Sequence, residues 1–272
     1  MAARILHVSD LHTGTREDPE VEAALHGLLD RVEAELIIAS GDLTHRGRRE
    51  EHERAHRFLT SFGPPVLTVA GNHDMPYGFP ARLTRTYAEF TRQWGELEQV
   101  HSSPALQVIG LNSSRRLRHQ GGALSSEQLV RAALRLQEAP DGAYRVVVLH
   151  HHMVGAPWRA ARKRPVSNRN HVLRALVEAG ADLILAGHIH QAAISERHEF
   201  EVVEGDVRAA VVSIAPGLGQ PRPRRLGEAR GLHVYEVGGR TLTTDTYIWG
   251  GGDWSHTARR VFPRGLGPLA IA

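Results

Sequence analysis

The alternation of short apolar segments with amphipathic stretches constrains the fold of this chain more than any other feature. Apolar runs with strand character are expected at residues 4–9, 35–40, 66–70, 106–111, 144–149 and 182–186. Helical periodicity separates them at residues 20–34, 50–62, 80–94, 125–137 and 170–179. This alternation is typical of a layered α/β fold in which most strands pair in parallel.

The pattern changes near residue 190. Only strand-like runs follow, at residues 192–196, 200–203, 207–214, 231–237 and 241–249. They read as an antiparallel set, interrupted by a loop at 216–230 that is rich in Gly, Pro and Arg. No flexible linker separates the two parts. We therefore expect one domain over residues 1–250, with the late strands as its second sheet, and an irregular tail over residues 251–272.

Polar side chains follow five of the expected strands, at the point where each strand ends. They are Asp10 and His12, Asp42, Asn72, His150, and His188 with His190. Any one of these fragments has an ordinary explanation as a turn or a solvated loop. Because ligands bind at the carboxyl ends of strands in open α/β sheets, all five together would converge on one place. The joint pattern predicts a metal site.

The residue types limit which metals can bind. The chain has no cysteine, so any metal must be held by imidazole, carboxylate, amide or water. This donor mixture suits Mn, Fe, Zn or Co better than Ca. Seven ligands are too many for one tetrahedral ion, but they suit two ions that share a bridge. Two metals about 3.5–4 Å apart can clamp a phosphoryl group, and they acidify a bridging water into hydroxide. We predict two divalent or trivalent ions, with Mn, Fe or Zn favoured.

The order Asp-x-His, Gly-Asp, Gly-Asn-His, His and Gly-His-x-His resembles that of the calcineurin-like metallophosphoesterase superfamily, over about residues 4–215. The resemblance implies a four-layer α/β/β/α sandwich with two central mixed sheets. It also implies a division of the ligands: one metal on Asp10, His12 and His190, the other on Asn72, His150 and His188, and Asp42 as the bridge. In that family pattern His73 donates a proton to the leaving oxygen, and we expect Asp74 to orient it.

Two positions depart from the pattern or leave it open. Many members carry a second Asp three residues after the bridging one, where this chain has His45, so His45 is expected to face substrate. Three histidines follow the strand at 144–149. His150 stands first and is the predicted ligand, His151 is the alternative, and His152 is expected to contact substrate or solvent.

The start of the chain, residues 4–12, is similar to that of the bacterial class III cyclic nucleotide phosphodiesterases, as are residues 111–114 and 121–125. This resemblance favours a phosphodiesterase acting on a 3′,5′-cyclic nucleotide, with Asn112 at the substrate. The basic segment 158–165 is either a solvated loop or a rim on which Arg162 attracts anionic substrates. The second basic loop, at 222–225, is expected to be solvated.

Other functions on the same scaffold remain open. They are an exonuclease-like DNA-processing phosphoesterase, a phosphomonoesterase or glycerophosphodiesterase, and a metal-dependent scaffold without catalysis. The net charge of +3 is mild, so a small phosphodiester or nucleotide is a better candidate partner than nucleic acid. No apolar run approaches eighteen residues and no secretory signal is recognisable, so we expect a cytoplasmic protein without a membrane partner. The oligomeric state stays open, a homodimer included.

Overall fold

A computed structural model of the chain describes residues 2–15, 19–154, 163–196, 210–219 and 230–264. Its strands are β1 Ala2–Val8, β2 Leu36–Ala39, β3 Val66–Thr68, β4 Val100–Ser102, β5 Leu106–Gly110, β6 Tyr144–Val148, β7 Leu183–Ala186, β8 Ala193–Glu196, β9 Val211–Ile214, β10 Gly231–Gly238, β11 Thr241–Trp249 and β12 Trp254–Pro263. Its helices are α1 Pro19–Val32, α2 Arg49–Thr60, α3 Ala81–Thr84, α4 Ala88–Trp94, α5 Ser126–Gln137 and α6 Arg169–Glu178.

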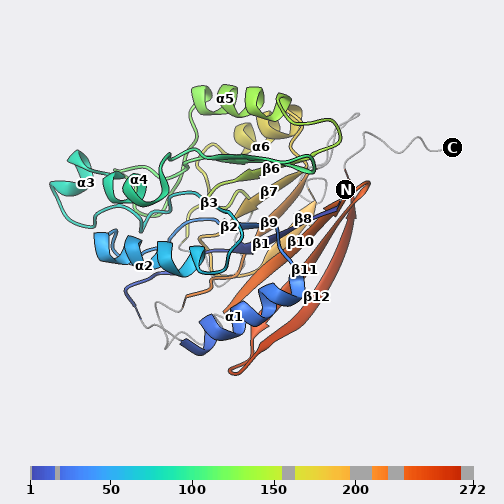
Figure 1. The fold of residues 1–272 in the computed structure, drawn as a ribbon. Coiled ribbons are helices and arrows are strands. Elements are labelled where there is room, and N and C mark those ends of the chain that lie inside the picture. Colours follow the sequence, from blue (N-terminus) through green and yellow to red (C-terminus); the bar gives the residue numbers. More distant parts are fainter. Residues whose placement is uncertain (1, 16–18, 155–162, 197–209, 220–229, 265–272) are drawn as a thin grey trace.

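The strands form two six-stranded sheets, ordered β12-β11-β10-β1-β2-β3 and β4-β5-β6-β7-β9-β8. One apolar core lies between the sheets. A second core packs α1 and α2 against the first sheet, and a third packs α5 and α6 against the second. Helices therefore lie on the outer side of each sheet (Figure 1). The predicted four-layer α/β/β/α sandwich with two mixed sheets is confirmed.

Parallel pairing brings the strand ends together. β1, β2 and β3 run parallel in the first sheet, and β5, β6, β7 and β9 run parallel in the second. β2 and β7 are buried along their whole length, which explains why both read as continuous apolar runs. Within the ranges that the structure describes, no helix is long and apolar enough to cross a membrane.

The late strands do not form a sheet of their own, so that expectation was wrong. β9 pairs in parallel with β7, and β8 pairs antiparallel with β9. β10 pairs antiparallel with β1 and carries β11 beside it. The physical reason is that β1 and β7 would otherwise each present an unpaired edge, and the late strands satisfy the backbone groups of both. The strand expected at residues 200–203 lies outside the described residues.

The expected irregular tail is also wrong for residues 254–263. They form β12, which pairs antiparallel with β11. The strand was hard to recognise because residues 255–261 are exposed and mostly polar, while only Trp254 and Phe262 are buried. Trp254 packs against Trp249, and the carboxylate of Asp245 accepts hydrogen bonds from Arg259 on β12. Two smaller differences are the short strand β4, which was not expected, and the region 80–94, which is divided into α3 and α4.

If β12 is part of the fold, its buried and exposed side chains should differ in their effect on stability. Phe262 belongs to the core between the sheets, whereas its neighbour Val261 is 61% exposed. We expect Phe262→Ala to lower the free energy of unfolding by about 3 kcal/mol. Val261→Ala is the matched control and should change it by less than about 0.5 kcal/mol. Urea denaturation measures both, and equal effects would contradict the assignment of this strand.

Candidate metal centre

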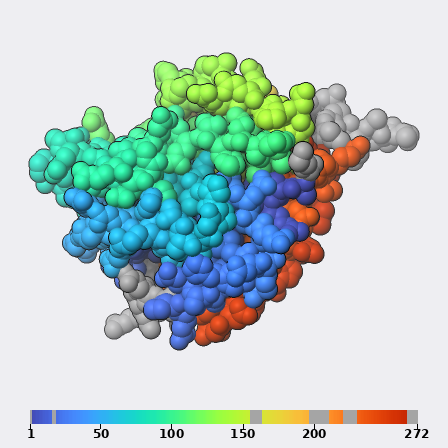
Figure 2. Space-filling view, in the orientation of Figure 1, coloured from blue at the N-terminus to red at the C-terminus, as the bar shows by residue number. Residues whose placement is uncertain are grey.

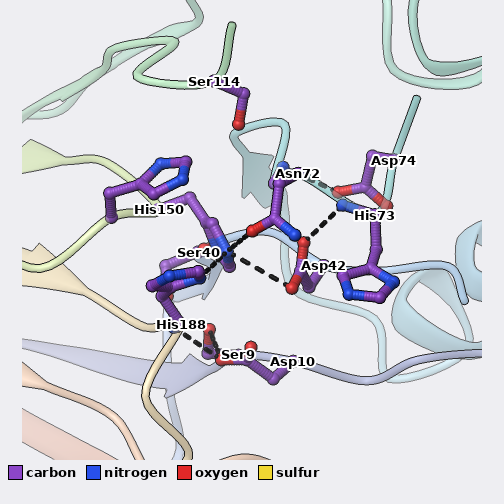
Figure 3. Close-up of polar contacts among 12 residues, drawn as sticks. Ser9, Asp10, Ser40, Asp42, Asn72, His73, Asp74, Ser114, His150 and His188 are labelled. Carbon is purple, nitrogen blue, oxygen red and sulfur yellow. Dashed lines mark hydrogen bonds and ion pairs between the residues drawn. The ribbon is translucent and has the colours of Figure 1, made fainter. Parts of the chain in front are cut away.

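The structure brings all seven predicted ligands to one buried place between the carboxyl ends of five strands. Asp10 and His12 follow β1, Asp42 follows β2, and Asn72 follows β3. The second sheet supplies His150 after β6, and His188 and His190 after β7. None of the seven residues is more than 5% exposed. In Figure 3, Asp42, Asn72 and His150 point toward one another, with His73 on the other side of Asp42.

These side chains form two groups, and in each group the donor atoms lie within 4.8 Å of one another. The first group is Asp10, His12 and His190, in which the two Nε2 atoms are 3.2 Å apart. The second is Asp42, His150 and His188. In that group Nε2 of His150 lies 3.1 Å from Nδ1 of His188 and 3.2 Å from the Oδ1 atom of Asn72.

Each carboxylate has one oxygen held by the protein and one left over. Oδ2 of Asp10 accepts from the hydroxyl of Ser9 at 2.7 Å and from the backbone N–H of His188 at 2.9 Å. Oδ1 of Asp42 accepts from the backbone N–H of His73 at 2.8 Å. The other oxygens are buried and face imidazoles: Oδ1 of Asp10 lies 3.1 Å from Nε2 of His190, and Oδ2 of Asp42 lies 3.3 Å from Nε2 of His150. Buried carboxylates are costly unless they are paired, and a cation between the carboxylate oxygens and the ring nitrogens would satisfy both kinds of donor atom.

The distances fit two metal ions. Two ligands of one ion, each about 2.1 Å from it, lie roughly 3.0–3.4 Å apart. The close nitrogen pairs within each group have that spacing. Oδ2 of Asp42 lies 3.3 Å from Nε2 of His150 and 3.9 Å from Nε2 of His12. It therefore faces one imidazole from each group, the position that a bridging carboxylate needs.

Backbone strain is concentrated at the same residues. Six non-glycine residues in the described ranges have a positive φ, and five of them are predicted ligands: Asp10, His12, Asp42, His188 and His190. Each such conformation costs about 1–3 kcal/mol and persists only where its surroundings enforce it. The strain turns the side chains of adjacent strand ends inward, toward a common centre.

Two glycines allow the strand ends to approach one another. A Cβ at Gly71 would collide with the backbone nitrogen and Oδ1 of Asp42. A Cβ at Gly187 would collide with the hydroxyl of Ser9. The Gly-Asn-His and Gly-His-x-His motifs thus begin with glycine for a steric reason: any side chain there would push the carboxylates out of place.

The electrostatics of the centre favour the forms that bind metal. Burial opposes the charged form of Asp10, but the facing His190 holds the pKa of this carboxyl well below its usual range. Burial lowers the pKa of His12 and of His188, so their imidazoles are neutral near pH 7. His150 differs: burial is outweighed by the charge of Asp42, which raises its pKa to about 9. A cation at this position would replace that proton.

Of the three consecutive histidines, the structure places His150 at the centre. Its Nδ1 donates to the carbonyl of Ser40 at 2.8 Å, which directs Nε2 toward Asp42 and Asn72. The ring of His151 instead pairs through Nδ1 with the hydroxyl of Ser113, at 2.9 Å. The geometry therefore favours the first of the two alternatives.

His73 lies beside the two groups with a fixed ring. Its Nδ1 donates to the carbonyl of His45 at 2.8 Å, and its ring meets that of His12 edge-on, with the centroids 4.8 Å apart. The expectation that Asp74 orients this ring is wrong. The carboxylate of Asp74 accepts from the backbone N–H groups of Thr44 and Gly71, so it joins the loops after β2 and β3. The backbone carbonyl of His45, and not the carboxylate of Asp74, orients the ring of His73.

The residues that were expected to contact substrate differ in where the structure places them. His45 is partly exposed and its donor nitrogen lies within 4.8 Å of those of His12 and His73, so it does face the centre. His152 is buried against His188, with ring centroids 5.8 Å apart, and is not in contact with solvent. Asn112 is also buried, and its Oδ1 accepts from the backbone N–H of Ser114. Arg162 and the basic loop at 222–225 lie outside the described residues.

Three residues that hold the ligands were missed in the sequence. Ser9 holds Asp10, Ser40 holds His150, and the carbonyl of Gln120 lies 3.2 Å from Nε2 of His188. Ser9 had a detectable signal, since its hydroxyl stands directly before Asp10 at a strand end. Ser40 and Gln120 act through backbone carbonyls, so their side chains gave no indication.

Comparison with known proteins identifies the class. Residues 3–192 match the family model described as calcineurin-like phosphoesterase, so the chain belongs to this family. The predicted family and the predicted reaction class, metal-dependent phosphoester hydrolysis, are confirmed. The chain is 28% identical over 208 residues to a probable cyclic nucleotide phosphodiesterase of Synechococcus sp., covering 72% of this chain and 77% of that protein.

Two further relatives carry different substrates in their names. The 3′,5′-cyclic adenosine monophosphate phosphodiesterase CpdA of Haemophilus influenzae is 27% identical over 214 residues, which cover 74% of each chain. The glycerophosphodiester phosphodiesterase GpdQ of Enterobacter lignolyticus is 26% identical over 207 residues, which cover 71% of this chain and 72% of that protein.

Solved structures support the fold. The purple acid phosphatase PPD1 of yellow lupin superposes with a TM-score of 0.70 at 9% identity, and the match covers 97% of this chain and 54% of the lupin chain. The chain thus spans about half the length of that protein. GAP50 of Plasmodium superposes with a TM-score of 0.59 at 12% identity, covering 99% of this chain and 90% of that one.

The two candidate histidines can be separated by metal content. We expect His150→Ala to bind one metal ion per chain in place of two, because Nε2 of His150 faces both Asp42 and Asn72. His151→Ala is the matched control, since its ring contacts Ser113 and should leave two ions bound. Elemental analysis after dialysis gives the stoichiometry, and thermal unfolding verifies that both variants are folded. Loss of a metal from His151→Ala alone would reverse the assignment.

Proposed function

We propose that this chain is a dinuclear metallophosphodiesterase whose leading substrate is a 3′,5′-cyclic nucleotide. The observation that carries the proposal is the meeting of two donor groups at one buried oxygen of Asp42, with His73 directly beside them. Asp10, His12 and His190 would hold one ion, Asn72, His150 and His188 the other, and Asp42 would bridge. The donor set suits Mn, Fe or Zn.

The protein's own groups have separate tasks in this proposal. When bound, the two ions supply Lewis-acid stabilisation of the phosphoryl group and activate water for in-line attack. Ser9, Ser40 and Gln120 keep the ligands aimed at the centre. His73 delivers a proton to the leaving oxygen. Because its Nδ1 already donates to the carbonyl of His45, the proton transferred is the one on Nε2.

Relatives named for cyclic nucleotides support the choice of substrate. A glycerophosphodiester is the second candidate, because another relative of similar identity is named for it. A DNA-processing role finds less support, since the net charge is only +3 and such enzymes bind many phosphates. We place the enzyme in the cytoplasm, since a chain without cysteine suits a reducing compartment.

Removing His73 should separate catalysis from metal binding. We expect His73→Ala to retain two metal ions and to lower kcat by about 10²–10⁴-fold, the usual contribution of a positioned acid. His171→Ala, an exposed histidine on α6, is the control and should leave kcat unchanged. Steady-state kinetics with bis(p-nitrophenyl) phosphate and elemental analysis measure the two properties. If His73→Ala loses metal, the residue is a ligand and not the proton donor.

The substrate is tested by a direct comparison. Protein loaded with Mn²⁺ is assayed against 3′,5′-cyclic AMP, glycerophosphocholine, a phosphomonoester and single-stranded DNA. We expect the highest kcat/KM for the cyclic nucleotide. A higher value for glycerophosphocholine would favour the second candidate. Hydrolysis of DNA that falls steeply with salt would favour the nuclease instead.

A further inference from the structure

Large hydrophobic side chains are exposed on one lobe next to the metal centre. They are Tyr77, Phe79, Leu83 and Leu117, exposed by 57%, 69%, 39% and 74%. We refer to these four residues as the apolar lip. The lobe contains α3 and α4 and stands out from the two sheets in Figure 1, and the space-filling view shows the same projection (Figure 2). Tyr77, Phe79 and Leu83 lie on or just before α3, and Leu117 directly follows Arg116, whose carbonyl accepts from Arg82 of α3, so these exposed apolar side chains indicate a contact surface.

The lip is held in one arrangement by a buried arginine. Arg82 on α3 is 1% exposed, and it donates from Nε to the carbonyl of Arg116 at 2.8 Å and from Nη1 to the carbonyl of Pro76 at 3.2 Å. The hydroxyl of Tyr87 donates to the carbonyl of Ser114 at 2.8 Å. These contacts tie the segment after β3 to the segment after β5. The lip is therefore built into the fold and not formed by chance proximity.

The inner end of the lip reaches the catalytic groups. The ring centroid of Tyr77 lies 6.3 Å from that of His73 and 5.7 Å from that of His119. His119 is exposed, and it directly precedes Gln120, whose carbonyl lies 3.2 Å from Nε2 of His188. Tyr77 and His119 thus connect the side of the centre occupied by His73 with the side occupied by His188.

The charge state of His119, next to Tyr77, also suits contact with an aromatic ligand. Burial and the nearby charge of Arg82 lower the pKa of His119, so its ring is neutral near pH 7. The two rings are inclined by 51° to each other, so Tyr77 offers one stacking face and the neutral imidazole of His119 stands beside it. The exposed face of a phenol ring can stack on another aromatic ring.

We infer that the exposed ring of Tyr77, flanked by His119, is an aromatic platform on which the base of a nucleotide substrate stacks while its phosphodiester lies at the metal centre. The inference rests on the proposed function and names what selects its substrate. A glycerophosphodiester has no flat group to stack, so the platform would favour nucleotides over glycerol esters. The outer lip residues, Phe79 and Leu117, would extend the surface without touching the phosphate.

The experiment compares two ligands that differ in the flat group. Binding of 5′-AMP and of glycerol 3-phosphate to the metal-loaded protein is measured by calorimetry for wild type, Tyr77→Ala, Tyr77→Phe and His119→Ala. We expect Tyr77→Ala to weaken binding of 5′-AMP by about 5- to 100-fold, the range for loss of one base-stacking contact. Its effect on glycerol 3-phosphate should be much smaller. Tyr77→Phe keeps the ring and should bind 5′-AMP like the wild type.

Turnover gives a second, independent readout. For Tyr77→Ala the ratio of kcat/KM for 3′,5′-cyclic AMP to that for glycerophosphocholine should fall about tenfold or more. Leu134→Ala on α5 removes another exposed apolar side chain, 55% exposed, and is the matched control that should leave the ratio unchanged. Equal weakening of both ligands, or no change in either, would overturn the inference. Because binding is measured apart from hydrolysis, an inactive enzyme would contradict the proposed function without deciding this point.

A different use of the lip would also be visible. If the surface joined two copies of the chain, the wild type would sediment as a dimer and Leu117→Ser as a monomer, with unchanged binding of 5′-AMP by Tyr77→Ala. That result would overturn the platform. A sedimentation coefficient that Leu117→Ser leaves unaltered supports it.

Discussion

The structure depends on keeping two carboxylates buried side by side. Asp10 and Asp42 are both fully buried, and each raises the free energy of ionising the other. Imidazoles from the second sheet offset this repulsion, since His190 faces Asp10 and His150 faces Asp42. Each carboxylate also accepts a hydrogen bond from a backbone N–H of another strand end. These carboxylate–imidazole pairs and hydrogen bonds thus connect the two sheets at the edge where the strands end.

That requirement explains the local backbone. A side chain directly after a parallel strand continues outward unless the chain turns, and five of the predicted ligands achieve the turn with a positive φ. The strain is tolerable because the flanking strands are buried and well paired. Glycine at positions 71 and 187 leaves room for the neighbouring carboxylate loops. The well-packed strands therefore maintain the strained backbone conformations at the site.

The surroundings of the centre divide into a buried and an exposed part. Behind it, Ser40 links the predicted ligand His150 to the buried His7, whose ring also contacts Tyr235 between the sheets. In front of it, the loops after β3 and β5 carry exposed aromatic and apolar side chains. Family membership follows from the buried part, which contains the motif residues. Selectivity among phosphoesters is expected from the exposed part, because surface loops can change without disturbing the buried side chains.

The sequence by itself determined the alternation of elements and the seven side chains at the strand ends, because these depend on local periodicity and on short motifs. The sandwich architecture was predicted from the resemblance to a known family that those motifs carry. Only the tertiary structure decided which sheet the late strands join, because edge pairing depends on which backbone edges are free in three dimensions. It likewise decided that a carbonyl, not Asp74, holds His73, and that His150 precedes His151 at the centre. Hydrogen bonds to backbone groups carry no side-chain signature, so these contacts could be seen only once the strands were in place.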